Sequence, residues 1–141
     1  MNDLDVMART LYGEARNQGQ EGIEAVACVI MNRVRAEKWF TGYIVIAGKK
    51  LPSVSETCLK RAQFSCWNHG DPNLDIIKSV TTKDKIFSNC MVVANKAING
   101  LLEDFTNGAT YYHTRNCQPE WAKGHIPCYE CGAHLFYNDV K

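Results

Sequence analysis

The chain has 141 residues, of which 45% are hydrophobic and 22% are charged. This length fits one domain with its own core, and the composition excludes an intrinsically disordered chain. The formal net charge is +1, so no charge imbalance points to nucleic acid as a partner, and no apolar run approaches the ~20 residues of a membrane span.

The first two predicted elements are amphipathic helices. Residues 2–3 can cap a helix that runs to Ala15, in which apolar residues recur at helical spacing. Gly19 and Gly22 interrupt this pattern. A second helix then ends near Lys38, and its apolar stripe is Ile23, Val26, Ala27, Ile30 and Val34.

The middle of the chain, residues 39–80, has an irregular pattern. Tyr43–Ile46 is a candidate strand, and a turn-prone Gly-Lys-Lys follows it at 48–50. Gln63–Trp67 is a second candidate strand. The next six residues, 68–73, have the composition of a loop.

The C-terminal half begins with a third long helix, capped by Thr81 or Thr82 and ending near Gly100. Gly108–His113 has the pattern of a strand, and the tail from Trp121 is rich in aromatic residues. Together the elements predict an α+β fold in which helices dominate and the β-sheet region is short. With no repeat or linker in sight, we expect one catalytic domain over residues 1–141.

Glu14 is the residue that fits a purely structural role least well. It follows Met7 by seven positions and Leu11 by three, which places it on or beside the apolar face of the first helix. Apolar surroundings favour the protonated carboxyl that a general acid requires. The alternative is a boundary residue that reaches solvent or pairs with Arg16 or Arg33.

The C-terminal third combines aromatic rings with polar groups. Such rings stack on the apolar faces of sugars or bases, while hydroxyl and imidazole groups bond to ligand hydroxyls; equally, the rings can fill the core of a small domain. The residues are Tyr111, Tyr112, His113, Trp121, His134, Phe136 and Tyr137.

Seven cysteines are many for this length, and their odd number leaves at least one thiol unpaired within the chain. Cys58 and Cys66 can form a bridge in an oxidising compartment. The C-terminal cysteines have a different possibility, which is a tetrahedral zinc site. His113 and His134 lie nearby in the sequence and could complete it. Its candidate ligands are Cys117, Cys128 and Cys131.

Six segments in order resemble the SleB-type, spore-cortex-lytic cell-wall hydrolase family, which includes phage and prophage endolysins. Each segment alone is weak evidence for the family, but the order and spacing of all six make the resemblance specific. The stretch from Thr41 to Lys50 is longer than is usual in this family. The six segments are Leu11–Arg16, Ala25–Val34, Gln63–Asn68, Gly108–His113, Pro119–Ala122 and Gly132–Tyr137.

The resemblance implies a small fold related to lysozyme-like lytic transglycosylases, with Glu14 as the catalytic residue. The implied substrate is the peptidoglycan glycan strand, cut between N-acetylmuramic acid and N-acetylglucosamine. A lytic transglycosylase needs one carboxylate, and no second one belongs to a family motif. We therefore expect 1,6-anhydromuramic products; the alternatives are a lysozyme-type muramidase, a zinc-containing amidase and a binding module.

The resemblance also suggests residues that hold the substrate, each of which has a structural alternative. Tyr111 and His113 are expected along the glycan groove, with Tyr112 on the opposite side of the strand. The full set of predicted substrate-binding residues is Gln63, Ser65, Tyr111, His113, Trp121, His134 and Tyr137.

No cofactor is expected, and the expected partner is the glycan strand, bound by a monomer without membrane insertion. The first five residues lack the basic and apolar character of a secretory signal. We therefore expect synthesis in the cytoplasm and action on the wall after release by another factor.

Overall fold

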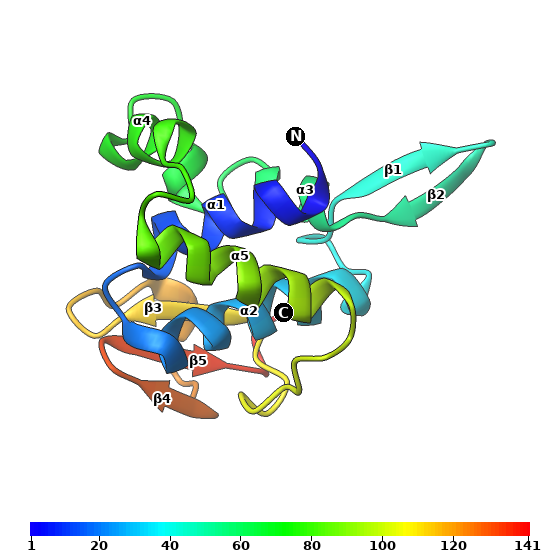
Figure 1. Cartoon of the computed structure of the whole chain (residues 1–141). Coiled ribbons are helices and arrows are strands. Elements are labelled where there is room, and N and C mark those ends of the chain that lie inside the picture. Colours follow the sequence, from blue (N-terminus) through cyan, green and yellow to red (C-terminus); the bar gives the residue numbers. More distant parts are fainter.

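Three long helices make the body of the molecule, which is described over residues 1–141 by a computed structural model (Figure 1). They are α1 (Asp3–Ala15), α2 (Gly19–Ala36) and α5 (Lys85–Ile98), as the apolar periodicity predicts. Their apolar faces meet in one core, whose largest buried members include Met7, Leu11, Val26, Ile30, Phe87 and Val93. No helix is both long enough and apolar enough to span a membrane.

The helix starts follow the capping chemistry, with two corrections. The Asn2 side chain accepts a hydrogen bond from the Asp5 N–H, as expected for an N-cap. The third helix is capped by Asp84, not by a threonine, because its carboxylate accepts bonds from the first free N–H groups of α5. Gly19 starts α2 instead of interrupting it, and Gly22 lies inside that helix.

The middle of the chain is more regular than its sequence pattern suggests. The strand at Tyr43–Ile46 is confirmed as β1, and it pairs with a second strand that was not expected, since Lys49 and Lys50 lie in that strand and not in the turn. Two short helices, capped by Ser53 and Asp71, were also not expected. The elements are β1 (Tyr43–Ile46), β2 (Lys49–Pro52), α3 (Val54–Leu59), η1 (Ser65–Trp67) and α4 (Pro72–Ser79).

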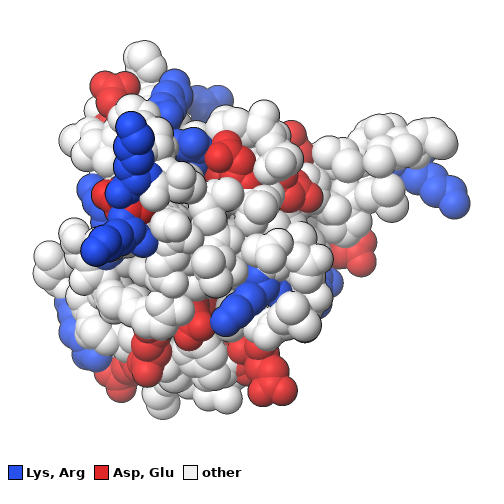
Figure 2. Space-filling view, in the orientation of Figure 1, with Lys and Arg blue, Asp and Glu red and all other residues white.

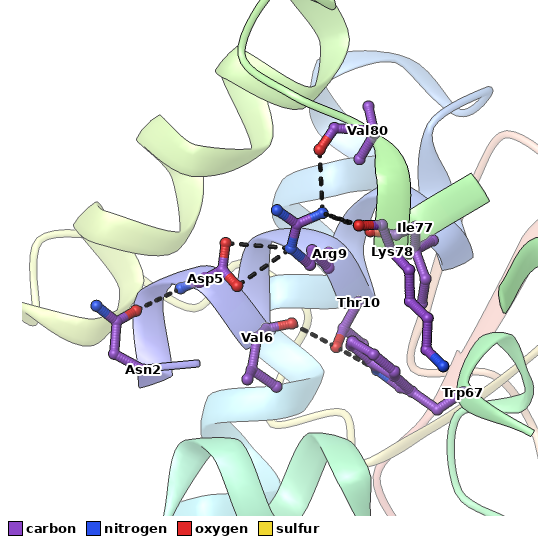
Figure 3. Close-up of polar contacts among 9 residues, drawn as sticks. All are labelled: Asn2, Asp5, Val6, Arg9, Thr10, Trp67, Ile77, Lys78 and Val80. Carbon is purple, nitrogen blue, oxygen red and sulfur yellow. Dashed lines mark hydrogen bonds and ion pairs between the residues drawn. The ribbon is translucent and has the colours of Figure 1, made fainter. Parts of the chain in front are cut away.

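The predicted strand at Gln63–Trp67 is wrong, because most of this segment forms the 3₁₀ turn η1. Its side chains explain the difference. The Trp67 indole N–H donates to the Thr10 hydroxyl at 2.9 Å, which fixes the segment to α1 (Figure 3). Arg9, one residue earlier, donates to backbone carbonyls at the end of α4, including that of Val80 at 3.0 Å. Both anchors come from α1, so that helix organises the segments around its C-terminal half.

A three-stranded antiparallel sheet closes the fold, in the order β3 (Tyr111–Thr114), β5 (His134–Tyr137), β4 (Tyr129–Cys131). The short turn η2 (Glu120–Ala122) lies between β3 and β4 in sequence. One sheet face packs on α2 through Phe136, and the other places Tyr111 and Tyr137 against Phe40. Acidic and basic side chains both occur across the visible face of the body (Figure 2).

Candidate active site

Glu14 lies in the last turn of α1, half-buried, where three distant parts of the chain meet. The Tyr112 hydroxyl of β3 donates to its Oε1 at 2.5 Å. The Cys66 backbone N–H of η1 points to its Oε2 at 3.4 Å. Both neighbours are neutral donors, and both hold the carboxylate in one orientation.

Gly13 explains how η1 comes so close to α1. A Cβ atom at this position would lie 2.6 Å from the Cβ of Cys66 and 2.8 Å from its Sγ, so only glycine leaves room for the contact. Burial, and then the charge of Glu14, raise the pKa of the Cys66 thiol far above its usual value. The thiol therefore stays protonated and is not a nucleophile.

Tyr112 is held as a permanent hydrogen-bond donor. Burial, followed by the neighbouring carboxylate of Glu14, raises the pKa of Tyr112 well above its usual value. The ring also packs against His134, with centroids 4.9 Å apart. The hydroxyl therefore keeps its proton and remains a hydrogen-bond donor to Glu14.

Arg33 does not pair with Glu14, and neither does Arg16. The buried guanidinium of Arg33 donates through Nε to the Thr110 carbonyl at 2.7 Å and through Nη1 to Oε1 of Gln63 at 3.3 Å. Burial lowers the pKa of Arg33. No carboxylate pairs with its guanidinium, which instead lies over the rings of Phe40, Phe64 and Tyr111. Arg16 donates instead to the Tyr12 carbonyl and the Asn73 side chain. The ion-pair alternative for Glu14 is therefore excluded.

A pocket of about 370 Å³ lies next to Tyr112, which is the hydrogen-bond partner of Glu14. Tyr112 and Gln63 form part of its wall, and Glu14 itself does not line it. Because Arg33 holds the carbonyl oxygen of Gln63, the amide N–H₂ of Gln63 is left to donate to a ligand. Tyr111 and Trp121 add aromatic rings to the same wall, with centroids 4.9 Å apart. The pocket thus combines a directed amide with flat apolar surfaces, which suits a sugar chain.

The remaining predicted site residues lie in three different environments. Ser65 is exposed on η1, one residue before Cys66. His113 and Tyr137 line a neighbouring hollow of about 210 Å³, with stacked rings and 2.7 Å between His113 Nε2 and the Tyr137 hydroxyl. His134 is only 3% exposed and lies behind Tyr112.

His134 is consequently part of the support of the site and not of its surface. Burial, with a smaller effect from His113, lowers the pKa of His134, so the ring is neutral at pH 7. Its Nδ1 is buried without a hydrogen-bond partner. Among its close neighbours is the Tyr112 ring, whose position it helps to fix.

Tyr112 and Arg33 are the residues that sequence reasoning missed at this site. The alternation of β3 placed Tyr112 opposite Tyr111 and His113, which is what the structure has, but the face toward Glu14 is that of Tyr112. Alternation along a strand gives no information on which face meets α1. Trp39 also lines the pocket, and no sequence motif indicated it.

The cysteine and histidine residues do not come together as a metal site. No group of three or more His, Cys, Asp or Glu side chains is placed so as to hold a metal ion, so the zinc alternative for Cys117, Cys128 and Cys131 has no geometric support. Cys58 and Cys66 are both buried and unbridged, and all seven thiols are free.

Comparison with known proteins identifies the family. The sequence profile of the cell wall hydrolase family matches residues 17–137. This chain belongs to that family. The predicted class, an enzyme that degrades the bacterial cell wall peptidoglycan, is therefore confirmed, although Glu14 lies three residues before the matched region.

Two solved structures of SleB are similar to this cell wall hydrolase over almost its whole length. The catalytic domain of the germination-specific lytic transglycosylase SleB from Bacillus anthracis is 25% identical, with a TM-score of 0.67 over 97% of this chain and 94% of that one. The catalytic domain of the Bacillus cereus SleB protein is 26% identical, with a TM-score of 0.68 over 96% and 89%. The SleB-type resemblance and the helix-dominated α+β fold are thus confirmed. No curated protein sequence matches the chain.

Proposed function

We propose that this cell wall hydrolase is a lytic transglycosylase that cuts the glycan between N-acetylmuramic acid and N-acetylglucosamine, with Glu14 as its one acid–base catalyst. The observation that carries the proposal is the surroundings of Glu14. Its hydrogen-bond partners are two neutral donors, Tyr112 and the Cys66 N–H, and no carboxylate is among them. A SleB relative is itself a lytic transglycosylase, which supports this chemistry.

The reaction needs one proton to leave Glu14 and one to return. The protonated carboxyl donates to the bridging oxygen as the bond from that oxygen to the muramic C1 breaks. The carboxylate then takes the proton from the C6 hydroxyl of the same muramic residue as O6 bonds to C1. This closes the 1,6-anhydro ring, consumes no water and returns Glu14 to its starting state.

The pocket lined by Tyr112 and Gln63 would position the strand. Gln63 would donate its amide N–H₂ to a sugar hydroxyl or N-acetyl carbonyl, and Tyr111 and Trp121 would stack on sugar faces. Ser65 would contact the strand from the exposed side of η1. His113 and Tyr137 would extend the groove into the neighbouring hollow.

Two of the other carboxylates that could assist a hydrolytic mechanism form contacts of their own. Asp71 caps α4 through the Asn73 N–H. Hydrogen bonds from Cys131 and Tyr129 lower the pKa of Glu21, which is exposed. A lysozyme-type muramidase, which releases reducing ends, is therefore the alternative that the product analysis must exclude.

The experiment compares wild type with Glu14→Gln on purified peptidoglycan. General acid–base catalysis contributes about 10²–10⁴-fold, so we expect activity to fall by about that factor while the thermal midpoint stays level. Glu24→Gln, a half-buried glutamate of α2, is the control and should retain full activity. Mass spectrometry of the wild-type products should show anhydromuramic ends. Reducing ends alone would reject the transglycosylase, and full activity of Glu14→Gln would reject the catalyst.

A further inference from the structure

The hairpin of β1 and β2, residues 43–52, projects away from the helical body (Figure 1). Its aliphatic side chains cover no core, because Ile44 is 40%, Val45 72%, Ile46 54% and Leu51 41% exposed. An isolated two-stranded hairpin is marginally stable, and exposed apolar strands favour aggregation. Apolar residues in such an element therefore point to a binding role.

These apolar side chains lie on both faces of the hairpin. Residues directly opposite in the register share a face, so Ile44, Leu51 and Ile46 lie on one face. Val45 lies on the other face with Lys50. A protein partner that docks on one face would leave the other in water. A bilayer surrounds both faces, which matches the observed distribution.

The charges of the hairpin have one sign. Its two charged residues are Lys49 and Lys50, and no Asp or Glu occurs from residue 38 to residue 55. The space-filling view shows blue atoms and no red ones toward the outer end of the hairpin (Figure 2). Lys50 bends back over the Tyr43 ring, with its Nζ 4.4 Å from the centroid. Lys50 is thus directed back toward the base of the hairpin. Lys49 lies opposite Ile46 next to the turn, and its long aliphatic stem lets its ammonium group reach the headgroups while the aliphatic residues enter the apolar layer.

The dimensions also fit an interfacial element. A strand of four residues extends about 13 Å at 3.3 Å per residue, against a depth of about 5–10 Å for interfacial segments. Tyr43 lies at the base, and Trp39, 55% exposed, precedes it in the chain. Tyr and Trp prefer the headgroup level of a bilayer. A search for membrane spans looks for about 20 consecutive apolar residues, so it does not detect a ten-residue hairpin that enters only the interfacial layer.

We propose that this hairpin docks the enzyme on an anionic lipid bilayer. Val45, Ile46 and Leu51 enter between the acyl chains, and Lys49 and Lys50 bind the headgroups. The outward backbone groups of a two-stranded hairpin need water, so its backbone stays in the interfacial layer. Because Trp39 lines the same pocket as Tyr112, the partner of Glu14, docking holds the active site next to the membrane surface.

The test is cosedimentation of the whole chain with vesicles of phosphatidylcholine alone or mixed with phosphatidylglycerol. We expect binding to the anionic vesicles that weakens with added salt. Lys49→Gln/Lys50→Gln should weaken this binding by about thirtyfold, and Val45→Ser/Ile46→Ser should weaken binding to both vesicle types. All of these side chains are exposed, so the thermal midpoints should match that of wild type.

The matched control removes two exposed aliphatic residues elsewhere. Leu101→Ser/Ile126→Ser deletes side chains that are 73% and 85% exposed, and it should bind vesicles as wild type does. Peptidoglycan cleavage should be unchanged in every variant, since the hairpin lies outside the catalytic contacts. Equal binding by wild type and the hairpin variants would overturn the proposal. So would a dimer, seen by sedimentation velocity without lipid, that the hairpin variants abolish.

Discussion

Replacing Tyr112 by phenylalanine removes one oxygen atom and the 2.5 Å hydrogen bond to Glu14. A hydrogen bond to a charged group contributes about 1.5–3 kcal/mol. If this hydrogen bond stabilises the Glu14 carboxylate in the transition state of proton transfer, its loss should lower kcat/KM on peptidoglycan by about 10- to 150-fold. Half-buried Glu14 regains some solvation, so the stability loss should be only about 1 kcal/mol, or roughly 2–4 °C in Tm.

Tyr12 provides the matched control for this substitution. Its hydroxyl donates to Oδ2 of Asp84 at 2.8 Å, so it is also a tyrosine of this site's surroundings bonded to a carboxylate, but that carboxylate is the N-cap of α5 and not Glu14. Tyr12→Phe should lower Tm by a similar amount and leave the cleavage rate unchanged. Dye release from labelled walls and a thermal melt measure both quantities on one preparation. Equal cleavage by the two variants would refute a role for Tyr112 in positioning Glu14.

Two further predictions concern the packing around Glu14. Gly13→Ala places a methyl group 2.6 Å from the Cβ of Cys66, so it should destabilise the fold by about 1–3 kcal/mol and reduce cleavage; adding Cys66→Gly should restore part of both losses, and a strictly additive double variant would contradict the contact. The pKa of His134 is lower in the folded protein than in the unfolded chain. As the pH falls below about 6.5, the unfolded chain therefore takes up a proton at His134 before the folded protein does, and the folded state loses stability. His134→Phe should therefore show a smaller drop in Tm between pH 7.5 and pH 5 than wild type, and an unchanged drop would contradict burial of a neutral ring.

The parts of the site that follow from the sequence are those encoded locally. Helical periodicity places Glu14 beside the apolar face of α1, and the structure has it there, half-buried. Strand alternation separates Tyr112 from Tyr111 correctly. Both inferences use the position of a side chain within its own element, which the pattern of the element fixes.

The contacts between elements could not be derived in this way. Tyr112 and Glu14 are 98 positions apart, and their hydrogen bond depends on how the sheet packs against α1. The sequence allows an ion pair between Arg33 and Glu14, but Arg33 is bonded to Thr110 and Gln63 instead. The segment Gln63–Trp67 has the composition of a strand, yet its anchors to α1 make it a 3₁₀ turn.

In the proposed mechanism Glu14 serves as both acid and base, and the position of Arg33 is compatible with this double role. A guanidinium bonded directly to Glu14 would favour its charged form so strongly that protonation, which the first step requires, would be costly. Here the cation binds the Gln63 carbonyl and the Thr110 carbonyl, and neutral donors alone bond to Glu14. Neutral donors stabilise a carboxylate less than a paired charge does. Glu14 thus has a neutral donor at each carboxylate oxygen and no directly bonded cation, an arrangement that suits the proposed catalysis by a single carboxylate.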